Sequence, residues 1–281
     1  MELNDHTYKQ FDIELDEIRS DFLQMGGCVQ SMIADAMEVL ATGDAECFER
    51  VKENEKQVNQ LELDIDDRIT TMLARRQPLG FDLRLLLAVT KMLTDMERCG
   101  DEAERIAVLG RRMHEDAQKF VPEMELQHVA TAVLGMLHDV MDSFARHDSV
   151  LAASVVRGDK KVDKEWKAAM RGLITYMIED PRMITGSIDL MLMSRSLGRI
   201  GDHCKNMAER VIFMVHGKDV RHQGAKAAER LVKKATRHIS AMQAPTSAAT
   251  ESISTPDATT AADASTPDVS QEVKPESGSQ S

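Results

Sequence analysis

Acidic side chains recur at four-residue spacing in two separate stretches of the 281-residue sequence. Residues four positions apart lie on one face of a helix, where two carboxylates repel each other by about 0.2–0.5 kcal/mol. A bound cation would turn this repulsion into ligation, and oxygen ligands without His or Cys suit a hard divalent or trivalent ion such as Mg²⁺, Ca²⁺, Mn²⁺ or Fe³⁺. The candidate ligands are Glu62, Asp66, Glu97 and Asp101 in the first half of the chain and Asp159, Asp163, Asp202 and Asn206 in the second.

A second interpretation of the same residues stays open. In a chain with a net charge of −12, an acidic helix flank is often a solvated surface that pairs with neighbouring cations such as Arg98 or Arg105. The recurrence of the pattern, and the matching acidic row on an adjacent helix, favour a cation site without excluding the solvated surface.

Other motifs that could support catalysis are scarce. The Glu-x-x-His pair at Glu125 and His128 has no second copy, whereas a ferritin-like di-iron site requires two. The sequence contains neither a P-loop nor a G-x-G-x-x-G motif, and no Ser or Cys nucleophile lies in a motif with a His base. The sequence therefore carries no motif for ATP hydrolysis, dinucleotide binding or nucleophilic catalysis.

A small basic cluster is a candidate for binding a protein partner. Arg75, Arg76 and Arg84 lie on either side of Pro78, at the turn between two expected helices. Solvated helix ends would carry the same residues, so both interpretations remain open.

The overall composition indicates a helical protein of the cytoplasm. Aromatic residues make up only 4% of the chain, which contains 19 Met residues. The 47 acidic and 35 basic residues argue against binding to nucleic acid or to anionic lipid. The acidic N-terminus does not resemble a signal peptide, no apolar run is long enough to span a membrane, and the four Cys residues lie far apart. We therefore expect a cytoplasmic protein with free, buried thiols.

The chain repeats itself at a nearly constant offset. Residues 54–58 match residues 158–162 at an offset of 104, and Arg98-Cys99-Gly100-Asp101 matches Arg199-Ile200-Gly201-Asp202 at an offset of 101. Pro78 lies between the two matched segments of the first half, and Pro181 lies between the two matched segments of the second half. Two ordered matches predict a duplicated unit.

Each unit is expected to hold three antiparallel helices, because long amphipathic stretches alternate with short connections. The predicted helices span 12–41, 46–76, 82–115, 123–146, 148–179 and 182–216, with a terminal helix near 220–241. The fold class is thus all-α, with two tandem, pseudo-symmetric three-helix bundles over residues 1–116 and 117–242. Residues 243–281 are rich in Ser, Thr and Pro and are expected to form a disordered tail.

Several of these motifs resemble the PhoU family of accessory regulators of phosphate-specific transport. They are Ala74-Arg75-Arg76-Gln77-Pro78, Asp82-Leu83-Arg84 and the two Arg-x-Gly-Asp segments, in the family's order. The resemblance extends from about residue 10 to residue 222. It implies the same two-bundle fold.

The resemblance also implies metal binding through one E/D-x-x-x-D motif in each repeat. Glu97 and Asp101 match the first motif. In the second motif Gly198 stands in the Glu position, four residues before Asp202, so that site is either weakened or completed differently. The candidates for completing it are Asp159 and Asp163.

The resemblance implies a regulator and not an enzyme: its function would be negative regulation of phosphate uptake and of the phosphate-starvation response. The protein would be a cytoplasmic homodimer that links the ATPase of a phosphate ABC importer to a two-component sensor histidine kinase. Two alternatives are a metal-binding helical scaffold and a metal-dependent enzyme, each unrelated to phosphate signalling.

Overall fold

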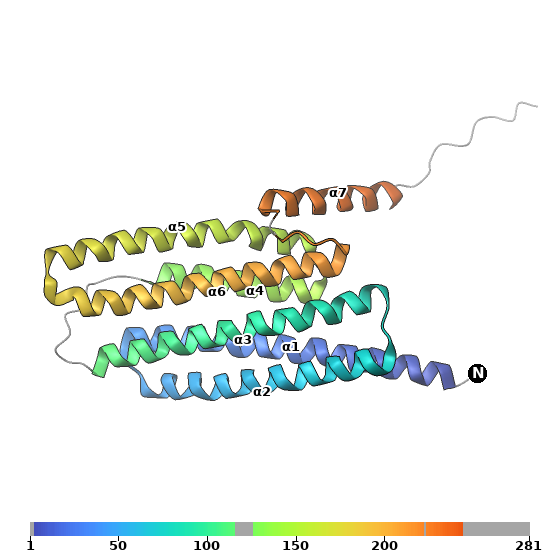
Figure 1. Cartoon of the computed structure of the whole chain (residues 1–281), viewed down its shortest axis with the longest axis horizontal. Helices are drawn as coiled ribbons and strands as arrows, with labels where there is room; N and C mark the ends of the chain where they lie inside the picture. The colour runs from blue at the N-terminus through green and yellow to red at the C-terminus, as the bar shows by residue number, and fades with distance from the viewer. Residues whose placement is uncertain (1–2, 116–125, 222, 244–281) are drawn as a thin grey trace, which may run out of the picture. The chain divides into compact units, whose positions relative to one another are not determined.

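Helices make up all the regular secondary structure in the described residues of the computed structural model, which are 3–115, 126–221 and 223–243. This result confirms the all-α prediction. None of the helices in these ranges combines the length and the apolarity that crossing a bilayer requires. The elements, shown in Figure 1, are α1 (Leu3–Thr42), α2 (Ala45–Arg76), α3 (Gly80–Glu115), α4 (Gln127–Arg146), α5 (Ser149–Glu179), a 3-10 turn η1 (Pro181–Met183), α6 (Ile184–His216) and α7 (Ala225–Gln243).

The same capping interaction starts the second helix of each bundle. The carboxylate of Asp44 accepts hydrogen bonds from the backbone N–H groups two and three positions later, at 2.7 and 3.4 Å. Asp148, 104 residues further on, accepts the equivalent bonds at 2.8 and 3.0 Å. Such a cap satisfies otherwise unpaired donors and is worth about 1 kcal/mol. The duplication is therefore visible in the local structure as well as in the sequence.

Some helix boundaries differ from the prediction. Helix α1 begins at Leu3 rather than at residue 12, and α4 begins at Gln127 rather than at 123. Helix α7 runs from Ala225 to Gln243 because Gly224 adopts a left-handed conformation, φ 77°, just before it. The apolar stripe locates the packed part of a helix, whereas the exposed ends are set by backbone hydrogen bonds that require no packing.

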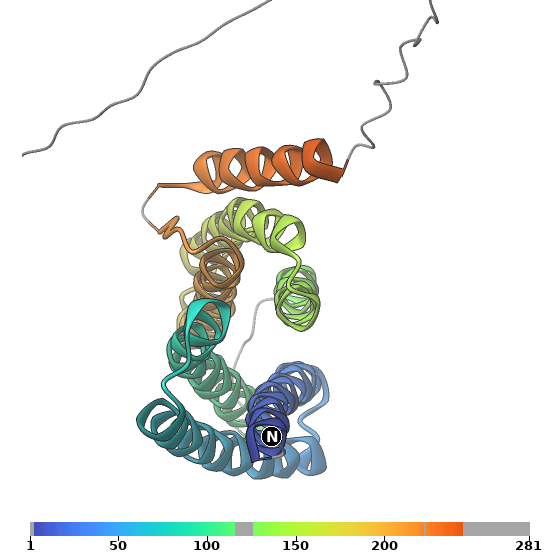
Figure 2. The same ribbon diagram turned by 90° about the vertical axis from the view of Figure 1, so that its right-hand side faces the viewer.

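Each half of the chain forms a three-helix bundle (Figure 2). Helices α1, α2 and α3 contact one another in the first bundle, and α5 and α4 both pack on α6 in the second. The two bundles meet mainly along α3 and α6, with a smaller contact between α1 and α4. Residues 1–242 form one compact unit, and the prediction of a tail falls almost entirely on 244–281, outside the described residues.

The amphipathic stretches form apolar stripes that are buried where the helices meet. Val58 and Ile65 of α2 are at most 1% exposed, and Met96 and Ala103 of α3 are fully buried. Gly110 of α3 allows an especially close approach, since a Cβ there would lie 3.0 Å from the Cα of Leu40 on α1. Packing of these stripes fixes the rotation of α2 and α3, and therefore the direction in which their polar residues face.

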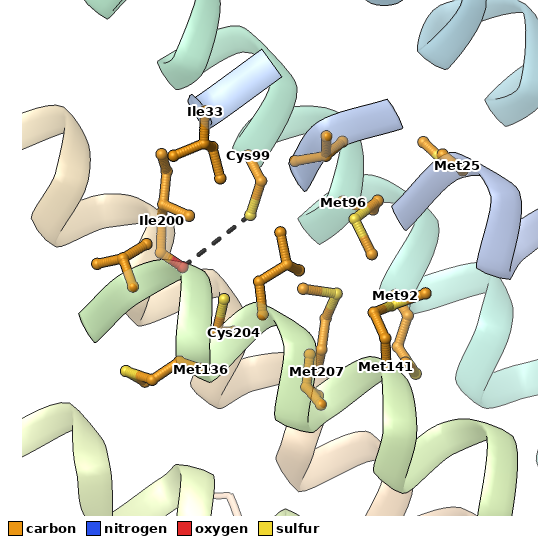
Figure 3. Close-up of a cluster of buried hydrophobic side chains, with 14 of the residues drawn as sticks. Met25, Ile33, Met92, Met96, Cys99, Met136, Met141, Ile200, Cys204 and Met207 are labelled. Carbon is orange, nitrogen blue, oxygen red and sulfur yellow. Dashed lines mark hydrogen bonds between the residues drawn. The ribbon is translucent and has the colours of Figure 1, made fainter. Parts of the chain in front are cut away.

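Methionine and cysteine side chains fill the junction between the two bundles (Figure 3). Cys99 of α3 and Cys204 of α6 are buried free thiols, as predicted. The Sγ atom of Cys99 lies 4.0 Å from the carbonyl oxygen of Ile200, the residue that takes the place of Cys99 in the second Arg-x-Gly-Asp segment. Because two repeat-equivalent residues contact each other, α3 and α6 pack around a local pseudo-twofold axis.

Candidate functional site

Helices α2 and α3 bring the predicted carboxylates of the first repeat together. The apolar stripes pack so closely that a Cβ on Gly100 would lie 3.5 Å from Cγ1 of Val58. The acidic side chains flank these stripes, and they are partly buried or exposed rather than fully enclosed. We call them the acidic row, which consists of Glu55, Glu62 and Asp66 on α2 and Glu97, Asp101 and Glu104 on α3.

The electrostatics of the acidic row are those of like charges held close together. Partial burial and the nearby charges of Asp66 and Asp101 raise the pKa of Glu62. Burial, followed by Asp101 and Glu62, likewise raises the pKa of Glu97. For Asp101, burial and the charge of Glu55 raise the pKa. Burial and like charge both disfavour the ionised form of these groups in the folded protein.

The donor set of the acidic row fits a hard cation in its chemistry. All of its members supply carboxylate oxygens, and a positive ion would relieve their mutual repulsion. The side chains do not yet form a ligand shell, because no three His, Cys, Asp or Glu residues converge on one point within the described part of the chain. A cation would therefore require these side chains to turn toward one another.

The predicted ligands of the second repeat are placed differently. Asp202 is exposed on α6, and Asp159 and Asp163 belong to α5, with side chains outside the described residues. Asn206 donates a hydrogen bond to Oδ1 of Asp95 on α3, at 3.2 Å. The structure thus directs Asn206 across the bundle junction.

Asp95 is a polar residue of the junction that sequence reasoning missed. Its Oδ1 atom also lies 2.8 Å from Nδ1 of His203 on α6. The sequence carries no local pattern that could identify this pair, since its members are 108 residues apart.

An aromatic residue lies beside the position where the second-repeat motif lacks its glutamate. A Cβ on Gly198 would be 3.8 Å from Cδ1 of Trp166 on α5. The guanidinium of Arg195 lies over the same indole ring, with Cζ 5.5 Å from the ring centroid. The Nε1 atom of Trp166 is buried and has no hydrogen-bond partner among the described residues.

The three arginines predicted as a partner-binding cluster make different contacts in the structure. Arg76 donates two hydrogen bonds to the carboxylate of Glu14 on α1, at 2.9 and 3.3 Å. Arg84 instead donates from Nε to the carbonyl oxygen of Met214 on α6, at 3.0 Å. Arg75 is exposed and, together with Arg76, lines a surface cavity of about 230 Å³ between α1 and α2. Of the three arginines, only Arg75 is exposed to solvent, as a residue that binds a partner protein should be.

Comparison with known proteins identifies the chain's relatives. A family model described as the PhoU domain matches residues 22–109 and 126–211, so that each match falls within one repeat. A phosphate-specific transport system accessory protein PhoU homolog from Pseudomonas putida is 43% identical over 224 residues, covering 80% of this chain and 88% of the relative. The accessory protein PhoU of Escherichia coli K12 is 37% identical over 233 residues, covering 83% and 96%.

Two solved structures have the same fold. The crystal structure of PhoU from Pseudomonas aeruginosa has a TM-score of 0.71 and 42% sequence identity, covering 74% of this chain and 100% of that one. The phosphate transport system regulatory protein PhoU from Streptococcus pneumoniae has a TM-score of 0.68 and 27% identity, covering 75% and 99%. These relatives are named as accessory or regulatory proteins and not as enzymes. The chain belongs to the PhoU family.

Proposed function

We propose that this protein regulates phosphate transport as a cytoplasmic adaptor. It links the ATPase subunit of a phosphate ABC importer to a two-component sensor histidine kinase. Through these contacts it restrains both phosphate uptake and the response to phosphate starvation when phosphate is plentiful. It works as a homodimer.

One observation carries this proposal. Relatives named as accessory proteins of the phosphate-specific transport system are 37–43% identical to the chain over 88–96% of their own length. The similarity therefore covers nearly the whole of these relatives rather than a single shared module. The two helical bundles also expose long helix faces, which suit the binding of partner proteins.

A reporter assay tests the regulatory role. A phosphate-responsive alkaline phosphatase reporter is measured in phosphate-rich medium, in strains with and without the gene. We expect high reporter activity without the gene and restored repression with the full chain. A reporter that stays silent in the deletion strain would contradict negative regulation.

Two further measurements test the assembly. The importer ATPase and the sensor kinase are each expressed with the tagged full chain, and co-purification of both is expected. Light scattering during size-exclusion chromatography should give twice the chain mass of 31.3 kDa. A monomeric mass, or capture of neither protein, would contradict the respective part of the proposal.

We also propose that the acidic row of the first repeat holds a hard divalent or trivalent cation, such as Mg²⁺, Mn²⁺ or an iron ion. The raised pKa values of Glu62, Glu97 and Asp101 support this proposal, because burial and then mutual repulsion raise them, and a cation would offset the repulsion. A bound ion supplies positive charge between α2 and α3, while the carboxylates of both helices hold it.

Metal analysis of the purified full chain tests the cation site. Glu97→Gln combined with Asp101→Asn should lower the bound metal, whereas Asp67→Asn, an exposed change on α2, should not. Metal content that is unaffected by the double substitution would show that the acidic row is not the binding site. The reporter strain then shows whether loss of metal affects regulation or only the stability of the bundle.

A further inference from the structure

The duplication allows each residue of the acidic row to be compared with its counterpart in the second repeat. The capping residues Asp44 and Asp148 set the offset at 104 for α2 and α5. The contact between Cys99 and Ile200 supports the offset of 101 for α3 and α6. With these offsets, the counterparts of Glu55, Glu62, Asp66, Glu97, Asp101 and Glu104 are Asp159, Trp166, Met170, Gly198, Asp202 and Lys205.

Four of the six counterparts lack a carboxylate. Trp166 and Gly198 replace two of the acids whose pKa values are raised in the first repeat. Met170 stands in place of Asp66, and Lys205 replaces Glu104 with a side chain of opposite charge. Asp163, whose counterpart is Asn59, adds one carboxylate, so the second repeat carries three acids and one lysine at these positions, against six acids in the first.

The exchanges at Trp166 and Gly198 also fit each other sterically. The indole Cδ1 lies 3.8 Å from the point where a Cβ on Gly198 would be, which is ordinary van der Waals contact. A glutamate at position 198 would have to share this space with the indole ring. The absence of a side chain at Gly198 thus accompanies the presence of a large one at Trp166.

The polar groups of Trp166 and Arg195 beside Gly198 are unsuited to binding a metal. Its Nε1 is a hydrogen-bond donor only, and this atom is buried without a partner among the described residues. The guanidinium of Arg195 lies 5.5 Å from the ring centroid and adds a fixed positive charge. Thr94 stands at the corresponding position of the first repeat.

We propose that the two repeats have diverged, so that the first repeat holds the cation and the second does not. Trp166 packs over Gly198 in place of the missing ligands, and Arg195 excludes positive charge from this position. The inference rests on the proposed cation site of the first repeat. It disagrees with the expectation of one metal motif in each repeat.

Substitution of two repeat-equivalent aspartates tests the divergence. The full chain is stripped of metal with a chelator and dialysed against Mn²⁺, and the bound Mn²⁺ is measured. Asp101→Asn should lose most of the bound Mn²⁺, whereas Asp202→Asn should keep the amount bound by the unchanged chain. An equal loss in both variants would overturn the proposal.

Restoring the missing acids tests the roles of Trp166 and Gly198. Trp166→Glu combined with Gly198→Glu should bind more Mn²⁺ than the unchanged chain. The matched control, Trp166→Gln with Gly198→Gln, removes the indole without adding charge and should show no gain. Circular dichroism confirms that both variants fold. A folded glutamate variant that gains no Mn²⁺ relative to this control would overturn the roles of these two residues.

Intrinsic fluorescence gives an independent readout, because Trp166 is the only tryptophan in the chain. Mn²⁺ is paramagnetic and quenches an indole beside it, so binding in the first repeat should leave the emission unchanged. Quenching that follows the binding curve would overturn the proposal. If the unchanged chain binds no Mn²⁺ at all, the first-repeat site is wrong, and the gain by the glutamate variant still decides the inference about the second repeat.

Discussion

His203 of α6 and Asp95 of α3 form a polar contact across the bundle junction, with 2.8 Å between Nδ1 and Oδ1. Both side chains are largely buried, at 15% and 16% exposure. The duplication relates this pair to a second one, in which the hydroxyl of Ser196 donates to the carboxylate of Glu102. The same two helix positions thus make a polar contact on each side of the pseudo-twofold axis.

Removal of the Asp95 carboxylate should weaken the junction between the bundles. Asp95→Ala deletes the acceptor shared by His203 and Asn206, which leaves two donors without their partner. We expect a loss of about 1–3 kcal/mol in the free energy of unfolding, measured by urea denaturation. The exposed Asp67→Ala on α2 should change it by less than about 0.5 kcal/mol. Equal stability of the two variants would contradict a structural role for the Asp95 contacts.

Two glycines in helices should respond oppositely to alanine. A Cβ at Gly110 would lie 3.0 Å from the Cα of Leu40, and a backbone atom cannot yield as a flexible side chain can. Gly110→Ala should therefore destabilise the protein by about 1–3 kcal/mol. A Cβ at Gly135 of α4 would meet no other element within 4 Å among the described residues, so Gly135→Ala should add about 0.5–1 kcal/mol through helix propensity. Thermal unfolding that shows a gain for both variants would refute the close approach of α3 to α1.

The acidic row should make stability depend on pH in a definite direction. The pKa values of Glu62, Glu97 and Asp101 are raised in the folded protein above ordinary values of 4.5, 4.5 and 3.8, so the folded state holds more protons than the unfolded state just above these values. Because the unfolded state binds fewer protons there, this contribution to stability falls as pH rises through the window between the unfolded and the folded pKa values.

Urea denaturation in chelator at pH 5 and pH 7 checks this dependence. Glu97→Gln combined with Asp101→Asn should be more stable than the unchanged chain at pH 7, by several tenths to about 1 kcal/mol, because the groups are partly solvated and screened. The advantage should shrink at lower pH, where the native carboxylates take up protons. An advantage that grows as pH falls would contradict the raised pKa values. Asp67→Asn serves as the exposed control.

Substitutions of Arg84 and Arg75 should affect different properties: the first should lower stability, and the second should lower partner binding. Arg84→Ala removes the hydrogen bond to the Met214 carbonyl and the packing of the guanidinium over Phe81, so stability should fall by about 1–2 kcal/mol. Arg75→Ala should leave stability within about 0.5 kcal/mol, because this side chain is exposed.

The partner-capture assay completes that comparison. Arg75→Ala should reduce co-purification of a partner protein, whereas Arg112→Ala, an exposed change near the end of α3, should not. Full capture by the Arg75 variant would remove this side chain from the partner-binding surface. The Arg84 variant is compared only under conditions in which it remains folded.

The sequence by itself determined the features that depend on neighbouring residues. Long amphipathic stretches predicted helices at 46–76, 82–115 and 148–179, which α2, α3 and α5 match closely. The caps Asp44 and Asp148 start α2 and α5 through backbone donors two and three positions later. These features are local because helix hydrogen bonds and caps join residues only two to four positions apart. The adjacency of the acids on α2 and α3 also followed, since a short turn forces consecutive helices to pack side by side.

Only the tertiary structure decided how the two repeats meet and how they differ. The contact of Asp95 with His203, the carbonyl partner of Arg84 and the packing of Trp166 beside Gly198 each join residues from different helices. Periodicity shows which face of a helix is buried but not which residue of a distant helix lies opposite. That choice depends on the axial position and crossing geometry of the packed helices, which side-chain packing sets after the helices have formed.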